Sequence, residues 1–227
     1  MWMQTLRKQR IKILLSVGLL LTSCVTTAND HFVFLTEALL KQVNDRWGDG
    51  AEQRVRGWDD MMRSGLEDVA ATDKSKLKAA NDYFNQVRWL SDQEHWGLED
   101  YWATPVETLA SNGGDCEDFS IGKYFSLLTT KVDTRKLRIT YVKSLTFNQA
   151  HMVLTYYESP GAEPYILDNI RGEIVLASKR EDLVPVYSFD GESIWLAQGR
   201  GQLKTDSQRS LPQWQQVNKR MGEKSLK

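Results

Sequence analysis

The sequence predicts an α+β fold in which helices come first and an antiparallel sheet follows. Apolar residues between positions 31 and 90 recur at helical spacing, whereas beyond Thr134 they alternate with a period of two. The turns expected at 158–162 and 169–172 are short enough for hairpins between antiparallel strands. Because the helical segments precede the strands, and 227 residues with 41% hydrophobic content can bury one core, we expect a single α+β domain.

Glycines and helix-starting residues divide the N-terminal half into segments. Gly48 and Gly50 interrupt the first helical stretch, since glycine weakens a helix interior. Asp73 begins a further helix, whose Leu77 and Phe84 lie on one apolar face. A short helix is expected over residues 106–110.

The remaining predicted elements follow a glycine-rich break at residues 111–114. A helix begins at Asp115 or Cys116 and runs to about Thr130. Four strands are expected after it, at residues 137–142, 151–157, 164–168 and 173–177, with further packed segments at Tyr187 and 194–196. The domain is therefore predicted over residues 29–197, and the polar residues 198–227 are expected to form a loose tail or a marginal helix.

The first 28 residues have the layout of a secretory signal peptide. Basic residues through Lys12 precede the apolar run 13–21, which is shorter than the about 20 residues that a bilayer span needs. Two cleavage sites compete: residues 21–24 resemble a lipobox, in which Cys24 would carry a lipid, and residues 26–28 offer an ordinary site. An uncleaved membrane anchor is the third interpretation. We expect export.

Cysteine content and charge restrict the function further. The chain has two cysteines, so removal of the signal segment leaves Cys116 as the single thiol, which excludes an intramolecular disulfide and a cysteine-type zinc site. Such a thiol is either a small buried apolar group or a nucleophile. The net charge is −1, and four basic residues lie before the first acidic residue, Asp30. Together with the lack of a nucleic-acid motif, this predicts no nucleic-acid partner.

The run from Gly113 to Asp118 places the thiol where its reactivity can be tuned. Glycines allow a sharp entry, Asp115 is a natural helix N-cap, and Asp118 lies where a capping-box carboxylate reaches back. Cys116 then occupies the first helical turn, where free N–H groups and the helix dipole lower a thiol pKa and can bind an oxyanion.

The three acids beside Cys116 oppose that effect. Asp115, Glu117 and Asp118 should raise the thiol pKa by like-charge repulsion. An imidazolium from His151 could stabilise the thiolate, or a hard cation such as Ca²⁺ could be bound by the acid oxygens. The alternative is that the acids only cap the helix and stay solvated.

A base and an orienting carboxylate can be located from the strand pattern. His151 begins a predicted strand, and Asp168 ends the strand that pairs with it. If the turn centres within 158–162, residues whose numbers sum to about 319–321 face each other. Asp168 then lies across from His151 or one diagonal away on the same face, within the reach needed to hold an imidazole tautomer.

The sequence resembles a known family, the LapG type of the bacterial transglutaminase-like cysteine proteinases. The resemblance covers about residues 80 to 196 and is most specific in the Gly-Asp-Cys-Glu-Asp run. It rests on five motifs: Trp102-x-Thr104-Pro105-x-Glu107, Gly114-Asp115-Cys116-Glu117-Asp118, Lys123-Tyr124, His151-Met152-Val153-Leu154 and Leu167-Asp168-Asn169. The order Cys, His, Asp is that of the wider papain/transglutaminase-like group, so the resemblance implies that core fold.

The resemblance also implies an activity. The resemblance implies a periplasmic, calcium-dependent endopeptidase. Such enzymes cut large surface adhesins near the N-terminus, beside a pair of alanines, and so disperse biofilm. A cyclic-di-GMP receptor of the inner membrane sequesters them. Carried over residue by residue, the match makes Cys116, His151 and Asp168 the catalytic triad. It makes Asp115, Glu117 and Asp118 the acidic motif linked to Ca²⁺. A lipid on Cys24 would depart from the family pattern by tethering the enzyme.

Two other functions fit the same residues. A transglutaminase or amidase would use the same triad to pass the acyl group to an amine. A non-catalytic exported binding module would retain the three residues without using them.

Overall fold

The computed structural model describes residues 35–191, 193–198, 201–205 and 211–223. The signal segment, with Cys24 and both cleavage sites, lies outside the described residues, as do Phe32 and Phe34 of the first predicted helix. The account below concerns the described residues of the unit His31–Lys227. Among the described residues, no helix is both long enough and apolar enough to cross a membrane.

Three helices form the N-terminal half, as predicted. Thr36 caps α1 (Glu37–Trp47), and Gly48, with φ at 83°, turns the chain into α2 (Asp49–Glu67). Thr72 caps α3 (Asp73–Phe84), so the predicted start at Asp73 is confirmed. Their apolar faces meet in one cluster around Trp58, which also donates a hydrogen bond from Nε1 to Ser126 Oγ at 2.8 Å.

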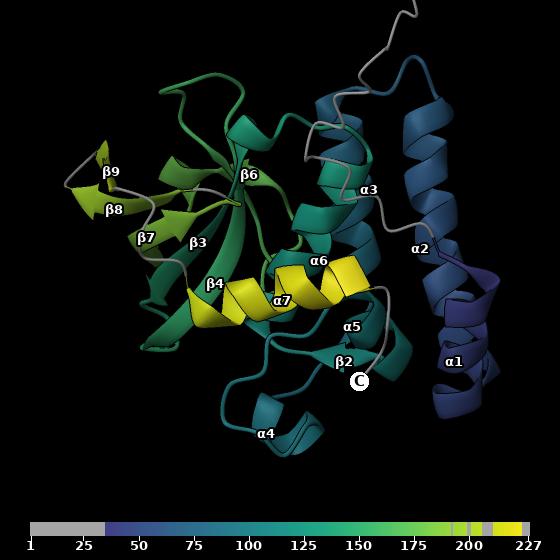
Figure 1. The fold of residues 1–227 in the computed structure, drawn as a ribbon. Helices are drawn as coiled ribbons and strands as arrows, with labels where there is room; N and C mark the ends of the chain where they lie inside the picture. Colours follow the sequence, from purple (N-terminus) through teal and green to yellow (C-terminus); the bar gives the residue numbers. More distant parts are fainter. Residues whose placement is uncertain (1–34, 192, 199–200, 206–210, 224–227) are drawn as a thin grey trace, which may run out of the picture. The chain divides into compact units, whose positions relative to one another are not determined.

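Short elements lead from these helices to α6, the helix at the centre of the unit. They are β1 (Arg88–Trp89), α4 (Asp92–His95), α5 (Pro105–Ser111) and β2 (Gly113–Gly114), followed by α6 (Cys116–Thr129). Figure 1 shows α6 between the sheet on one side and α2 and α3 on the other. Gly122 makes this packing close, because a Cβ there would lie 2.0 Å from the Phe84 ring.

A seven-stranded antiparallel sheet fills the C-terminal half, in the order β6-β5-β4-β3-β7-β8-β9. The strands are β3 (Leu137–Ser144), β4 (Gln149–Tyr156), β5 (Tyr165–Leu167), β6 (Val175–Leu176), β7 (Leu183–Phe189), β8 (Ile194–Gln198) and β9 (Gly201–Thr205). Single 3-10 turns precede β3 (Thr134–Lys136) and follow β6 (Ala177–Lys179). The α+β prediction is confirmed, and the residues of α6 and of one sheet face share the main core.

Of the two alternatives predicted for residues 198–227, a loose tail or a marginal helix, the structure shows a helix, but one that is packed rather than marginal. Helix α7 (Pro212–Glu223) packs into the main core, where Trp214 is stacked on Phe125 and meets Tyr124 and Phe189 edge-on. In Figure 1 this helix, in yellow, crosses in front of α6. The segment is polar overall, but Trp214 and Val217 are spaced to share one helical face, and both are buried.

Candidate active site

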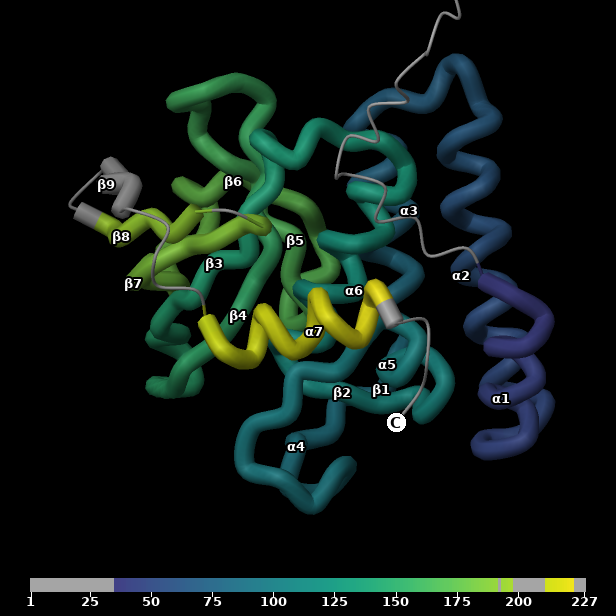
Figure 2. Tube along the Cα trace, viewed as in Figure 1, coloured from purple at the N-terminus to yellow at the C-terminus, as the bar shows by residue number. Residues whose placement is uncertain are grey.

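Two short paired strands, β1 and β2, position the chain just before Cys116. Strand β2 pairs in parallel with β1, with Arg88 opposite Gly113, and the two lie side by side in Figure 2. The sharp turn predicted at the glycines occurs one residue earlier, at Asn112, which has a left-handed φ of 55°. The glycines are needed for space instead: a Cβ on Gly114 would lie 2.7 Å from Asp118 Oδ2.

Asp118 is buried beneath the start of α6 and holds two segments together. Its Oδ2 accepts the Asp115 N–H at 3.3 Å, as the predicted capping box requires, and its Oδ1 accepts the Ala103 N–H at 2.7 Å. Burial raises the pKa of Asp118 well above its ordinary value, and the carboxyls of Asp115 and Glu117 raise it further. Asp118 therefore holds the start of α6 to the loop at Ala103, and it also belongs to a group of neighbouring carboxyls.

Cys116 is the first residue of α6, and its thiol faces carboxylate. The sulfur donates to Glu117 Oε2 at 3.0 Å. Burial, followed by the charges of Glu117 and Asp115, raises the pKa of the Cys116 thiol well above its usual value, while the backbone N–H of Met152 acts in the opposite direction. The direction of this pKa shift is the one predicted for the neighbouring acids, with burial as its largest cause.

His151 and Asp168 meet directly, as the register predicts. Leu154 lies opposite Leu167, so the numbers of facing residues sum to 321, at the upper end of the predicted range. His151 Nε2 lies 2.8 Å from Asp168 Oδ1, and both side chains are buried. Strand β4 begins at Gln149, two residues before the predicted start, so His151 is held inside a strand.

Asp168 is held from three further directions. Its Oδ1 accepts the Ile170 N–H at 3.0 Å, its Oδ2 lies 2.7 Å from Arg180, and its backbone carbonyl accepts Asn85 Nδ2 at 2.9 Å. Burial acts to raise the pKa of Asp168, but His151, Ile170 and Arg180 lower it to about 2. An ionised carboxylate only accepts hydrogen bonds, so Nε2 of His151 carries the proton and Nδ1 is left as the basic nitrogen.

Two of the three predicted catalytic residues are in direct contact, and the third lies near them. His151 and Asp168 are in contact, and Cys116 reaches β4 at Met152, the residue after His151. Within the described part of the chain no hydrogen bond joins Cys116 to His151. Arg180 and Asn85, which fix Asp168, were missed by sequence reasoning, because only the folded chain places them against that carboxylate.

The acids beside Cys116 belong to a larger cluster than the sequence predicts. Asp92 and Asp100 join the predicted acids. One carboxylate oxygen from each of Asp92, Asp100 and Glu117 lies within 4.8 Å of the other two. A second set with the same spacing joins Asp92 to Asp115 and Asp118. Sequence reasoning missed Asp92 and Asp100, since only the parallel β1–β2 pair brings residues 88–92 beside 113–115.

The cluster has the properties of a site for a hard cation. Asp92 Oδ1 and Asp115 Oδ1 are buried without a hydrogen-bond partner. Burial raises the pKa of Asp92 to about 6, and burial and Glu117 raise that of Asp115. In the described residues, no lysine or arginine forms an ion pair with Asp92, Asp115, Glu117 or Asp118. Oxygen-only ligands of this kind suit Ca²⁺.

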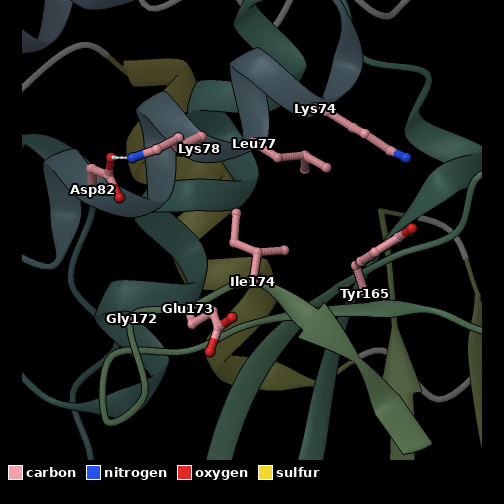
Figure 3. A pocket seen from close by; sticks show the side chains of 8 residues that line it. All are labelled: Lys74, Leu77, Lys78, Asp82, Tyr165, Gly172, Glu173 and Ile174. Carbon is pink, nitrogen blue, oxygen red and sulfur yellow. Dashed lines mark hydrogen bonds and ion pairs between the residues drawn. The ribbon is translucent and has the colours of Figure 1, made fainter. Parts of the chain in front are cut away.

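A separate hollow lies between α3 and the β5–β6 turn (Figure 3). Its volume is about 360 Å³, and Leu77 and Ile174 face each other across it. The ion pair between Lys78 and Asp82 lies at one side. The lining contains neither Cys116 nor a histidine, so this hollow is separate from the predicted catalytic residues.

Comparison with known proteins agrees with the geometry. Residues 51–183 match the family model of the bacterial transglutaminase-like cysteine proteinases. The chain belongs to this family. It is therefore a cysteine peptidase, as the sequence motifs predict, and the family assignment and the papain/transglutaminase-like core are confirmed.

Solved structures of LapG from Legionella pneumophila are similar to this family member. The EGTA-treated form is 42% identical with a TM-score of 0.71, over 82% of this chain and 96% of that one. The calcium-bound form is 40% identical with a TM-score of 0.69, over 82% of this chain and 99% of that one. No curated protein sequence matches the chain.

Proposed function

We infer that this cysteine proteinase is a periplasmic, calcium-dependent endopeptidase with Cys116 as nucleophile, His151 as general base and acid, and Asp168 as the orienting carboxylate. The observation that carries the proposal is the buried hydrogen bond between His151 and Asp168, beside the helix start that presents Cys116. A histidine fixed in one tautomer by a carboxylate, next to a thiol, is the arrangement that nucleophilic acyl transfer requires.

The proposed reaction proceeds through a thioester. His151 takes the thiol proton, and the Cys116 sulfur attacks the carbonyl carbon of the scissile peptide bond. As the carbon–nitrogen bond breaks, His151 returns the proton to the leaving amine. Water, deprotonated by His151, then attacks the thioester and releases the acid and the free thiol.

Charge development in this reaction is met by groups that the fold holds in place. The backbone N–H of Cys116 is one of the first N–H groups of α6, which have no partner within the helix. Such donors stabilise the oxyanion of a tetrahedral intermediate. Asp168, with its pKa held low, stays ionised and stabilises the imidazolium.

The acid cluster is the proposed calcium site. The ligands predicted from the sequence motif are Asp115, Glu117 and Asp118, and the structure adds Asp92 and Asp100, whose carboxylates lie in the same cluster. When bound, Ca²⁺ would supply positive charge beside Cys116, which opposes the effect of the acids on the thiol pKa. The calcium-bound form of LapG from Legionella pneumophila supports this assignment.

The substrate and partners follow from the family resemblance. We propose cleavage of the N-terminal region of a large surface adhesin near a di-alanine site, which controls biofilm release. An inner-membrane cyclic-di-GMP receptor would sequester the enzyme. The signal segment supports a periplasmic location, either soluble or anchored by a lipid on Cys24.

A digestion assay tests the proposal. The mature protein is incubated with an adhesin N-terminal fragment that contains a di-alanine site, in Ca²⁺ or in excess EGTA, beside the variant Cys116→Ala. Two fragments, separated at the di-alanine site by mass spectrometry, are expected only from the unaltered protein in Ca²⁺.

Each other outcome removes a defined part of the proposal. Cleavage that persists in EGTA removes calcium dependence, and cleavage by Cys116→Ala removes the nucleophile. Cross-linked or amine-labelled products without fragments would identify a transglutaminase or amidase. Substrate binding without any covalent product would identify a binding module.

A further inference from the structure

Arg220 connects the last turn of α7 to the loop that precedes α5. Its side chain is 8% exposed, and its guanidinium donates to Glu107 Oε2 at 2.7 Å. The same group donates to the Tyr101 hydroxyl and to the Trp102 backbone carbonyl. Its carbon also lies 4.7 Å from the centre of the Tyr101 ring. One buried side chain thus holds two adjacent loop residues and the first turn of α5, more than 110 positions earlier in the chain.

That loop presents its amides to the acid cluster. The Tyr101 N–H donates to Asp92 Oδ2 at 2.5 Å, and the Ala103 N–H donates to Asp118 Oδ1 at 2.7 Å. These donors lie one residue before and one residue after Trp102, whose carbonyl Arg220 holds. The orientation of two cluster carboxylates therefore depends on a loop position that the guanidinium fixes.

Glu107 completes the connection. Its Oε2 accepts the Thr104 N–H at 2.8 Å and the Thr104 hydroxyl at 2.9 Å, and its Oε1 accepts the Tyr101 hydroxyl at 3.0 Å. The carboxylate is buried, so an opposite charge beside it is needed. Arg220 supplies that charge from α7, and the fork of its guanidinium allows it to hold the carboxylate and the loop together.

We propose that Arg220 is a positioning residue for the acid cluster: it fixes loop 101–104 so that the amides of Tyr101 and Ala103 aim Asp92 and Asp118, and it thereby sets the affinity of the cluster for a divalent cation. This inference rests on the proposed function, since it takes the cluster to be the calcium site. Partners that orient metal ligands typically change metal affinity by about 10–100-fold when they are lost.

The test measures Ca²⁺ binding directly, by calorimetry on the full mature protein after chelator treatment and dialysis. Arg220→Gln should weaken Ca²⁺ binding by about 10–100-fold. Arg220→Lys should give an intermediate loss, because an ammonium keeps the charge beside Glu107 but lacks the fork that also reaches the Trp102 carbonyl. The Lys variant also keeps the test informative if the Gln variant does not fold.

Two control variants separate positioning from general stability. Val217→Ala removes a buried contact of the same helix and leaves the guanidinium in place, so it should lower the melting temperature in EGTA with little change in Ca²⁺ affinity. Arg135→Gln removes an exposed arginine that pairs only locally with Asp133, and should change neither.

Three results would overturn the inference. The first is unchanged Ca²⁺ affinity in both Arg220 variants, and the second is an equal loss of affinity in Val217→Ala at the same loss of melting temperature. The third is a lack of Ca²⁺ binding by the unaltered protein, which would overturn the calcium part of the proposed function together with this inference. The digestion assay in EGTA distinguishes that case, because cleavage there would leave the peptidase assignment intact.

Discussion

Asn85, the C-cap residue of α3, donates its side-chain N–H to the backbone carbonyl of Asp168 at 2.9 Å, so the end of an N-terminal helix fixes the residue whose carboxylate orients His151. The catalytic geometry therefore depends on packing between α3 and the end of β5. Variants far from the thiol in sequence can test this dependence.

Replacing Asn85 by Ala should lower kcat about tenfold with a smaller effect on KM, because Asp168 would lose one of the contacts that aim it at His151. Steady-state cleavage of a peptide substrate measures both constants. Asn44→Ala is the matched control, since Asn44 bonds only to Asp49 and Glu52 at the surface-facing side of the helices. Equal kcat in the two variants would contradict the role assigned to Asn85.

Gly114→Ala should disrupt the start of α6. The added Cβ would lie 2.7 Å from Asp118 Oδ2 and 2.9 Å from Asp118 Cβ, so the buried carboxylate has to move. We expect a loss of about 1–3 kcal/mol in the free energy of unfolding, measured in urea, together with a loss of activity. Gly50→Ala is the control: its nearest neighbour is an arginine side-chain end at 3.6 Å in a helix, where Ala is favoured over Gly. An unchanged Gly114→Ala protein would mean that Asp118 is free to shift.

Removal of Ca²⁺ should lower thermal stability, because a ligand that binds only the folded state stabilises it. At a Ca²⁺ concentration of about 100 times the dissociation constant, the expected gain is about 2.7 kcal/mol. Asp92→Asn should reduce the difference in melting temperature between Ca²⁺ and EGTA, since it removes a carboxylate that two cluster sets share. Glu99→Gln, a change at a neighbouring exposed acid, should preserve the difference. If both variants respond to Ca²⁺ like the unaltered protein, Asp92 is not a ligand.

Replacement of Arg180 by Met should lower stability near neutral pH and make the loss of stability in acid smaller. The pKa of Asp168 is lowered from 3.8 to about 2, so its ionised form stabilises the fold by about 2 kcal/mol above pH 4, and this contribution is lost as the pH falls toward 2. Without Arg180 the pKa of Asp168 rises toward its value in the unfolded chain, so the ionised carboxylate contributes less at pH 7 and less stability is lost as the pH falls. Urea unfolding between pH 3 and pH 7 measures this acid dependence of the free energy of unfolding. The control Arg135→Gln breaks an exposed ion pair instead, and the same acid dependence in both variants would contradict the prediction.

Lys123→Met should change the alkaline dependence of stability. Lys123 is buried in α6, and burial lowers its pKa from 10.5 to about 7, with Asp168 and Asp82 acting in the opposite direction. Between these two values the unfolded chain holds a proton that the folded chain has lost, so stability rises with pH in the unaltered protein. The Met variant lacks this rise and should be more stable at pH 6, by at most about 5 kcal/mol. A stability difference that is constant from pH 6 to pH 10 would exclude a titrating lysine.

The sequence predicts most of the local geometry around the nucleophile. Asp115 and Asp118 mark the helix start that Cys116 occupies, and the hairpin register places Asp168 within reach of His151, because both features follow from patterns a few residues long. In contrast, the sequence does not predict Asp92 or Arg180 at the site. Their positions depend on the β1–β2 pair and on the return of the chain after β6, which local patterns do not encode.

The packing of the C-terminal helix into the core was not predicted, for a related reason. Its composition is polar, and the spacing of Trp214 and Val217 is visible only when the few apolar residues are read as one helical face. The cluster they enter is built from Tyr124, Phe125 and Phe189, whose positions are set by distant elements. Average polarity therefore does not reveal a helix that is held in the core by a few aromatic contacts of Trp214.

The seating of α7 in the core has a consequence for the order of folding. The contacts of Arg220 span 113 to 119 positions of the chain, and contacts of such long range form late because the loop entropy must first be overcome. A partly folded chain without α7 would expose the aromatic surface around Phe125. It would also lack the guanidinium that fixes loop 101–104. Such an intermediate should be both prone to aggregation and inactive, so proteolytic activity would arise only with the last step of folding.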